Sequence, residues 1–229
     1  MTRQNELRID RIFHPTDFSH GSDLAFVHAL RLACALKATL GILHVHRHHH
    51  TDWSNYPAVR ETLSRWKLLP PDAARSDVSD LGISISKAAV ADRDPNDGIL
   101  GYLEAHHADL LVLATHQRHG LDRWMHQHIA EKVNRGTDGA TLFIPYETRG
   151  FVDEQTSACR LNRILVPVDR DPDPTPAVHL AAQLATALDS PACEIRLLHL
   201  GTAEELPTIK IPTETQLQFK WVTIHATDK

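Results

Sequence analysis

Short apolar runs alternate along the first part of the chain with segments whose apolar residues recur at helical spacing. The runs predict buried strands at 12–16, 40–45, 83–90, 109–115 and 140–145. The helical spacing predicts helices at 24–35, 58–69, 97–107 and 121–134. Asp94 and Pro95 are start signals for the third helix, and Pro70 is a stop signal for the second. Strands that alternate with helices indicate an α/β fold with a parallel sheet covered on both faces. We expect this domain to span 1–148.

The opening pattern of the chain returns after a polar stretch at 149–159, which is typical of a linker. Residues 8–17 and 160–169 share their arrangement of apolar, basic and acidic positions. A repeat of this length indicates two copies of one unit. The sequence ends at Lys229, before a fourth strand, its helix and a fifth strand could follow. We therefore expect 160–229 to form an incomplete second copy.

Charge and composition exclude several classes of protein. The net charge is −5, from 24 basic and 29 acidic residues, so no basic surplus indicates nucleic-acid binding. No apolar run reaches the length of a membrane span, and residues 1–10 lack the apolar core of a signal peptide. Cys34, Cys159 and Cys193 are far apart, which suits a reducing compartment. We expect a cytoplasmic protein that binds neither nucleic acid nor membrane.

Five motifs occur in a characteristic order along the chain. They are His14-Pro-Thr-Asp17-Phe-Ser, Ile42-Leu-His-Val45, Asp109-Leu-Leu-Val-Leu-Ala-Thr-His116, Ile129-Ala-Glu-Lys-Val133 and Thr141-Leu-Phe-Ile-Pro145. With these motifs the chain resembles the universal stress protein family, in a tandem form. The resemblance implies an open, Rossmann-like parallel five-stranded sheet in the order 3-2-1-4-5, followed by the incomplete second copy. Ligands of such folds bind beyond the carboxyl ends of the strands, where the order reverses.

The resemblance also implies a nucleotide site, which is degenerate in this chain. Many family members bind ATP with a Gly-x2-Gly-x9-Gly-Ser/Thr motif. Its positions fall here on Ala114, Gln117, Gln127 and His128, so every glycine and the hydroxyl residue are replaced. Only glycine lets backbone N–H groups approach phosphate closely in turns with positive φ. We therefore expect this site to bind phosphate groups weakly.

Other parts of that site are retained. By the resemblance, Asp17 corresponds to the acidic residue that contacts the nucleoside, and Val45 corresponds to the residue beside the adenine. Gly120 remains at an off-motif position, ahead of a predicted helix whose free N–H groups still suit an anion. ATP or AMP is therefore an alternative ligand. Asp169 is the counterpart of Asp17 in the second copy, which we expect not to bind a nucleotide unaided.

Histidine is unusually abundant, at 17 residues. In the fold of the family, several histidines and one carboxylate border the same crevice. A transition-metal site, such as a zinc site, would recruit His46, His116, His119, His128 and Asp17. Against this, the family often has histidine at positions 44 and 116, and the histidines at 48–50 lie in a loop where water solvates them.

No catalytic motif supports an enzyme, since no P-loop, dinucleotide fingerprint or nucleophile elbow occurs. The leading hypothesis is a non-enzymatic, universal-stress-like protein that acts in the stress response by ligand sensing or protein interaction. The alternatives are an ATP/AMP-binding stress protein with slow hydrolysis and a histidine-based metal-binding protein with metal-dependent hydrolysis. The strand at 164–168 would lack a neighbour, and an open sheet edge is normally covered. We expect the first domain, a second copy in a homodimer, or a partner protein to cover it.

Overall fold

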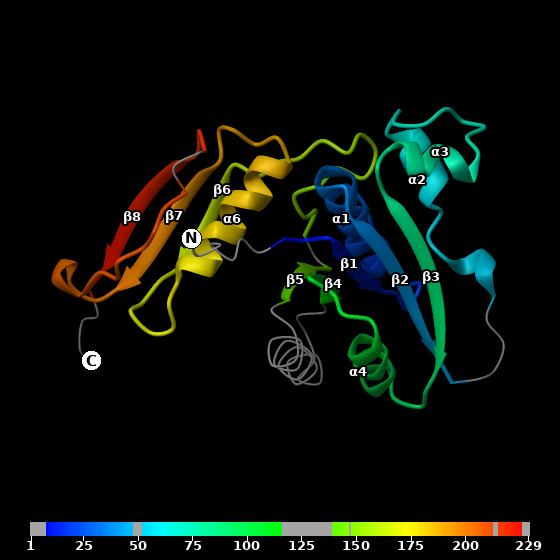
Figure 1. The fold of residues 1–229 in the computed structure, drawn as a ribbon, viewed down its shortest axis with the longest axis horizontal. Helices are drawn as coiled ribbons and strands as arrows, with labels where there is room; N and C mark the ends of the chain where they lie inside the picture. Colours follow the sequence, from blue (N-terminus) through cyan, green and yellow to red (C-terminus); the bar gives the residue numbers. More distant parts are fainter. Residues whose placement is uncertain (1–7, 48–51, 116–138, 147, 213–214, 226–229) are drawn as a thin grey trace, which may run out of the picture. The chain divides into compact units, whose positions relative to one another are not determined.

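The computed structural model describes residues 8–47, 52–115, 139–146, 148–212 and 215–225. The chain divides into two compact units, Arg8–Ala158 and a second one that begins at Cys159. The first contains β1 (Arg11–Pro15), α1 (His20–Leu36), β2 (Thr39–His46), η1 (Trp53–Asn55), α2 (Val59–Arg65), α3 (Arg75–Asp80), β3 (Ser84–Ala91), α4 (Pro95–Ala105), β4 (Leu110–Thr115) and β5 (Ala140–Pro145), all visible in Figure 1. None of the described helices has the length and apolar character needed to cross a membrane.

The sheet of the first unit has five parallel strands in the order β3-β2-β1-β4-β5. The α/β class, the parallel sheet and its 3-2-1-4-5 order are therefore confirmed. The strand order reverses between β1 and β4, because β2 and β3 follow one another on one side of β1, and β4 and β5 on the other side. The carboxyl ends of these two central strands thus border the position where open α/β sheets hold ligands.

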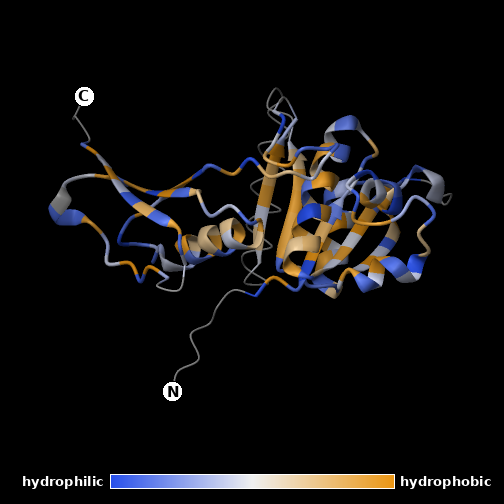
Figure 2. Ribbon diagram, turned by 90° about the horizontal axis from the view of Figure 1, so that it is seen from above, coloured by the Kyte–Doolittle hydropathy of each residue, from blue (hydrophilic) through white to orange (hydrophobic). Residues whose placement is uncertain are grey.

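Both faces of this sheet are covered by helices. Side chains of α4, among them Ile99 and Leu103, pack with Phe13, Leu43 and Leu111 on one face. Successive side chains of a strand point to opposite faces, so the neighbouring residues of these strands face the other side, where α1 lies in Figure 1. Figure 2 accordingly shows hydrophobic colour along the strands of this sheet.

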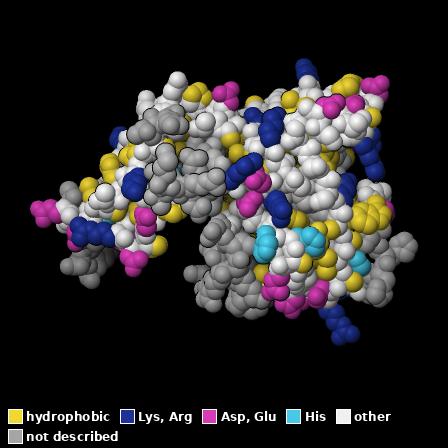
Figure 3. Space-filling view, viewed as in Figure 1, with side chains coloured by type: hydrophobic (Ala, Val, Ile, Leu, Met, Phe, Trp, Pro, Cys, Tyr) yellow, Lys and Arg dark blue, Asp and Glu magenta, His cyan; other side chains and the backbone are white. Residues whose placement is uncertain are grey.

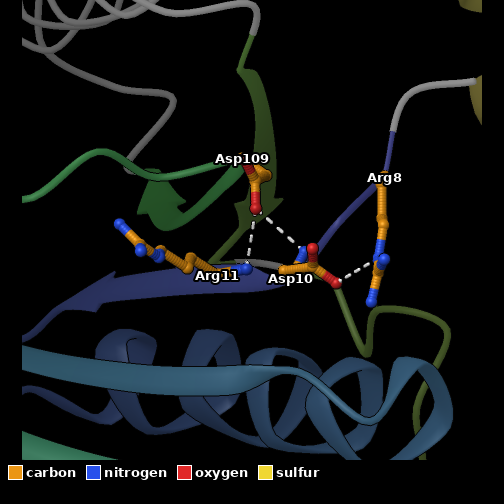
Figure 4. A network of polar contacts seen from close by, with 4 residues as sticks. All are labelled: Arg8, Asp10, Arg11 and Asp109. Atoms are coloured by element: carbon orange, nitrogen blue, oxygen red, sulfur yellow. Dashed lines mark hydrogen bonds and ion pairs between the residues drawn. The ribbon is translucent and has the colours of Figure 1, made fainter. Parts of the chain in front are cut away.

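A carboxylate joins the two central strands at their amino ends. The Oδ2 atom of Asp109 accepts hydrogen bonds from the backbone N–H groups of Asp10 and Arg11, each at 2.8 Å. Arg8 in turn donates from Nε to Oδ1 of Asp10 at 2.7 Å, as Figure 4 shows. Since Asp109 immediately precedes β4, this contact aligns β1 beside β4 and so helps to place the carboxyl ends of both strands.

The second unit contains β6 (Arg163–Pro167), α6 (Thr175–Ala187), β7 (Glu194–Leu200), η2 (Ala203–Glu205) and β8 (Gln218–Ile224). Its described sheet has three parallel strands in the order β6-β7-β8. Val178 of α6 packs on Val166 and Ile195 to form a small core. Within the described residues β6 pairs with β7 alone, so its other edge is open. The domain boundaries at 148 and 160 stay a prediction, and residues 149–158 belong to the first compact unit.

The segment between β2 and β3 differs from the sequence prediction. Helix α2 ends at Arg65 instead of 69, because Lys67 adopts a left-handed conformation at φ 60° and Leu68 N–H bonds to Leu63 O at 2.9 Å. Helix α3 was not predicted, since it has only 6 residues and lacks a helical apolar stripe. The predicted helix at 121–134 lies outside the described residues.

Candidate functional site

Asp17 lies directly after β1, beside the point where the strand order reverses, and its side chain is exposed. Its Oδ1 atom accepts a hydrogen bond from Ser19 N at 2.9 Å. Ser19 is the N-cap of α1, and its hydroxyl accepts a hydrogen bond from Ser22 N at 3.3 Å. The turn between β1 and α1 therefore holds one carboxylate oxygen of Asp17, while Oδ2 has no hydrogen-bond partner among the described residues.

A buried polar network supports this turn from below. His14 is fully buried, and its Nδ1 donates to the backbone oxygen of Val112 in β4 at 3.1 Å. Its Nε2 lies 3.4 Å from the hydroxyl of Ser22, which donates to Thr16 Oγ1 at 2.9 Å. Burial lowers the pKa of His14 to about 4, so the ring is neutral at physiological pH. The network ties β1, α1 and β4 together beneath the carboxylate of Asp17.

Aromatic rings gather next to Asp17, and we call Phe18, His44, Trp53 and Tyr56 the aromatic cluster. The Phe18 ring stacks on His44 with centroids 4.1 Å apart, and Tyr56 meets Phe18 edge-on at 5.4 Å. Trp53 stacks on Tyr56 at 5.0 Å. Phe18 has φ 62°, a left-handed conformation that is costly for a bulky residue and that turns its ring onto β2. His44 is fixed because its Nδ1 donates to Thr16 O at 2.8 Å.

Val45 and His46 end β2 next to this cluster. Val45 is half-buried against α4, where a Cβ on Gly98 would come within 2.7 Å of its Cγ1 atom. The ring of His46 lies 6.4 Å from that of His44, and its buried Nδ1 has no partner among the described residues. Ala114 lies in β4, half-buried and paired with Ile144 of β5. Asp17 and Val45 thus come from adjacent strand ends, and Ala114 from the other side of the reversal.

The remaining candidates lie outside the described residues: His116, Gln117, His119, Gly120, Gln127 and His128. The arrangement of the phosphate motif therefore stays a prediction. No group of three or more histidine, cysteine or acidic side chains in the described part of the chain could hold a metal ion. His46 and Asp17 therefore do not form a metal site with other described side chains, and the zinc hypothesis depends on the three histidines that are not described.

Sequence reasoning missed Phe18 and Tyr56. The segment that precedes Tyr56 is polar and rich in histidine, yet Tyr56 is only 4% exposed and donates from its hydroxyl to Ala88 O at 2.6 Å. The signal available in the sequence was a pair of aromatic residues in otherwise polar segments, because aromatic side chains in such segments usually pack on something.

Comparisons with known proteins agree with the fold. The profile described as "Universal stress protein family" matches residues 8–145. A universal stress protein solved with cAMP is 17% identical, with 61% of this chain and 99% of that chain covered and a TM-score of 0.41. One from Archaeoglobus fulgidus DSM 4304 is 15% identical over 95% of this chain and 78% of that chain, with a TM-score of 0.47. One from Archaeoglobus fulgidus with dAMP is 16% identical over 60% and 98%, with a TM-score of 0.34. No curated protein matches the chain.

Proposed function

Because the chain belongs to the universal stress protein family, we propose that it is a non-enzymatic stress-response protein whose crevice binds an adenine nucleoside or its monophosphate. The observation that carries this proposal is the exposed carboxylate of Asp17 beside the stacked rings of Phe18 and His44, at the reversal of strand order. The site would report on ligand availability through binding, without a chemical step.

The polar and aromatic groups suit the two parts of a nucleoside. Asp17 Oδ2 can accept hydrogen bonds from ribose hydroxyls, in the way that acidic residues at the ends of Rossmann strands do. The aromatic cluster offers ring faces and edges to a planar base. The turn and the buried network around His14 hold the carboxylate in place before a ligand arrives, which reduces the entropy lost on binding.

Phosphates beyond the first are expected to add little affinity. Gln117 and Gln127 replace glycines at motif positions, and their side chains would occupy the space that backbone N–H groups need around phosphate. Hydrolysis also lacks support from the described residues near the crevice. The contact between Ser22 and His14 is buried, at 3% and 0% exposure, and cannot reach a ligand.

Calorimetric titration with adenosine, AMP and ATP tests the proposal, and the repeat provides a matched control. Asp17→Asn should weaken AMP binding by about tenfold, because it removes a charge-assisted hydrogen bond. Asp169→Asn makes the same change at the equivalent position of the second unit and should leave the affinity within about twofold. Equal losses in both variants, or no AMP binding by the unmodified protein, would contradict the nucleoside site.

Restoring the glycines tests separately whether the glutamines weaken phosphate binding. The double change Gln117→Gly and Gln127→Gly should raise the affinity for ATP and leave that for adenosine unchanged, since only the phosphates contact the restored backbone. A parallel gain for adenosine would show that the glutamines obstruct the whole crevice.

A second candidate function, interaction with another copy of the chain, is favoured by the open edge of β6. Leu165 in this strand is 53% exposed, and β6 pairs only with β7 among the described residues. We propose that two copies associate through this edge, since two-fold dimers are the commonest oligomers and exposed edges are normally covered. Leu165→Lys should then shift the sedimentation coefficient from dimer to monomer. Ile224→Lys, in β8, should not, although Ile224 is 50% exposed. A monomer at all concentrations would refute the dimer.

A further inference from the structure

A large cavity lies away from the crevice, along the connection between β2 and β3. Its volume is about 730 Å³, within the usual range of small-molecule sites. It lies between the short helices α2 and α3 and the first half of β3, which Figure 1 shows side by side. The crevice, in contrast, lies at the carboxyl ends of the strands. The two sites therefore use different parts of the first unit.

Three basic side chains line this cavity: Arg60, Arg75 and Lys87. Arg60 is held by a hydrogen bond from one terminal guanidinium nitrogen to Ala73 O at 3.0 Å. Lys87 donates from Nζ to Pro57 O at 3.2 Å. Figure 3 shows Lys and Arg side chains on the part of the first unit where Figure 1 places α2, α3 and β3. Two of the three charges are therefore held in position by backbone oxygens. We call this site the basic cavity.

Within the described residues, the positive charges of the basic cavity form no ion pair with the acidic residues that line it. Glu61 and Asp72 also line it, but the ion pairs of the described residues involve Arg8, Arg163 and Arg196 instead. Burial lowers the pKa of Lys87, and the nearby charges of Arg75 and Arg60 lower it further. Like charges that crowd a partly buried ammonium raise its free energy, and an anion among them would relieve this repulsion.

Apart from Ser79 and Ser84, the uncharged lining residues are apolar. Val59, Val78 and Ile83 are 7%, 8% and 3% exposed and form its inner wall. Trp53 is 55% exposed at its margin, although such a large ring is normally buried. An indole face beside a group of cations suits a ligand that combines a ring with a negative charge.

We propose that the basic cavity binds a small organic anion that carries an aromatic ring. Its carboxylate or phosphate would lie among Arg60, Arg75 and Lys87, where the forked guanidinium donors match two oxygens of either group. Its ring would lie against Trp53 and the apolar wall. This site shares Trp53 with the aromatic cluster but uses Arg60, Arg75 and Lys87 where the proposed nucleoside crevice uses Asp17, so each can fail without the other.

Calorimetric titration of the full chain with phenyl phosphate, benzoate and benzyl alcohol tests this inference. Both anions should bind, and the neutral alcohol should bind at least about tenfold more weakly, because it cannot use the cations. The tighter of the two anions identifies the acidic group of the natural ligand. Equal binding of all three compounds would overturn the proposal, and so would equal binding of phenyl phosphate and inorganic phosphate.

Charge-removing variants locate the binding site. Arg75→Gln and Lys87→Gln should each weaken phenyl phosphate binding by about tenfold. Arg65→Gln removes the same charge from α2 outside the cavity lining and should leave the affinity within about twofold. If Lys87→Gln does not fold, Arg75→Gln decides alone. Losses no larger than that of Arg65→Gln would place binding elsewhere.

Asp17→Asn separates this inference from the proposed function. The variant should bind phenyl phosphate with unchanged affinity, since Asp17 does not line the basic cavity. Displacement of phenyl phosphate by adenosine, which carries no negative charge, in simple competition would show that both compounds occupy the crevice and would overturn the second site.

Discussion

Strands β1 and β6 have nearly the same sequence pattern but different surroundings. β1 pairs with β2 and β4, whereas β6 pairs within the described residues with β7 alone. Phe13 of β1 is 7% exposed, and Leu165 at the equivalent position of β6 is 53% exposed. The equivalent apolar position is thus a core position in one copy and a surface position in the other. The sequence pattern predicts the strand, whereas the neighbouring elements determine whether its side chains are buried in a core.

The polar residues of the two copies also differ in their contacts. Asp17 accepts from Ser19 N in the turn before α1, while Asp169 accepts from the next residue, Arg170, at 2.7 Å. His44 stacks on Phe18, while its counterpart His199 is 2% exposed and its Nε2 has no partner among the described residues. An aspartate at a strand end is therefore not a site by itself. In the proposed nucleoside site, a turn, an aromatic ring and a second central strand surround the aspartate as well.

The largest expected effect concerns the equivalent residues Phe13 and Leu165. Phe13→Ala should reduce the free energy of unfolding by about 3–5 kcal/mol, because it leaves a cavity against α4 and β4. Leu165→Ala should reduce it by less than about 1 kcal/mol, since the side chain is half exposed. Urea denaturation of both variants measures the difference. These values apply to the dissociated chain at low protein concentration. Where the proposed dimer forms, association covers Leu165, and the loss for Leu165→Ala should be larger.

The second-largest effect is a pH dependence of the free energy of unfolding. His14 should cause it, whereas its counterpart Val166 does not titrate. Burial holds the pKa of His14 at about 4, below the 6.5 of an exposed histidine, so the unfolded chain binds the proton more readily. The stability from neutral His14 is complete above pH 6.5 and is lost as the pH falls towards 4. At pH 4 the free energy of unfolding should be lower by about 3 kcal/mol for this reason.

His14→Val copies the second unit and tests this dependence. The variant should be less stable at pH 7 by about 1 kcal/mol, because Val112 O loses its hydrogen bond. It should be more stable than the unmodified protein at pH 4, so the two curves of unfolding free energy against pH should cross. Part of the dependence should remain, since burial also lowers the pKa of His28. Parallel curves would mean that His14 is not the titrating group.

A smaller effect is expected at Gly150, which lies where the segment after β5 contacts α1. Its φ is 61°, and a Cβ there would lie 2.3 Å from the His28 ring. That ring accepts hydrogen bonds at Nε2 from Phe151 N and Val152 N at 3.0 and 3.1 Å. Gly150→Ala should therefore lower the free energy of unfolding, measured by urea denaturation, by about 2 kcal/mol.

Gly101 supplies the control for that change. It lies within α4 with no atom near its missing Cβ, so Gly101→Ala should be neutral or stabilising by up to about 1 kcal/mol. A loss at Gly150 no greater than at Gly101 would show that residues 149–158 behave as a free linker.

Local signals in the sequence predicted most elements of the fold. Apolar runs located the strands, Asp94 caps the helix for which it was a start signal, and the family resemblance gave the strand order. The sequence did not show that Lys67 would end α2 early, because the left-handed conformation depends on the contacts of the turn. It also did not show the environment of Lys87, since residues brought together by folding are distant along the chain. The role of Asp17 came from the family resemblance and stays a prediction, and its aromatic neighbours were not predicted from the sequence.

Tyr56 belongs to the aromatic cluster and also contacts Lys87, one of the side chains that line the basic cavity. Its ring meets Phe18 at 5.4 Å, and the ammonium of Lys87 lies 5.5 Å from its centroid. A ligand that moves this ring from one side changes the energy of the other side. Thermodynamic linkage then makes the effect reciprocal: the nucleoside and the aromatic anion must alter each other's affinity by the same factor. One phenol ring would thus make two separate binding events into a single response to two signals.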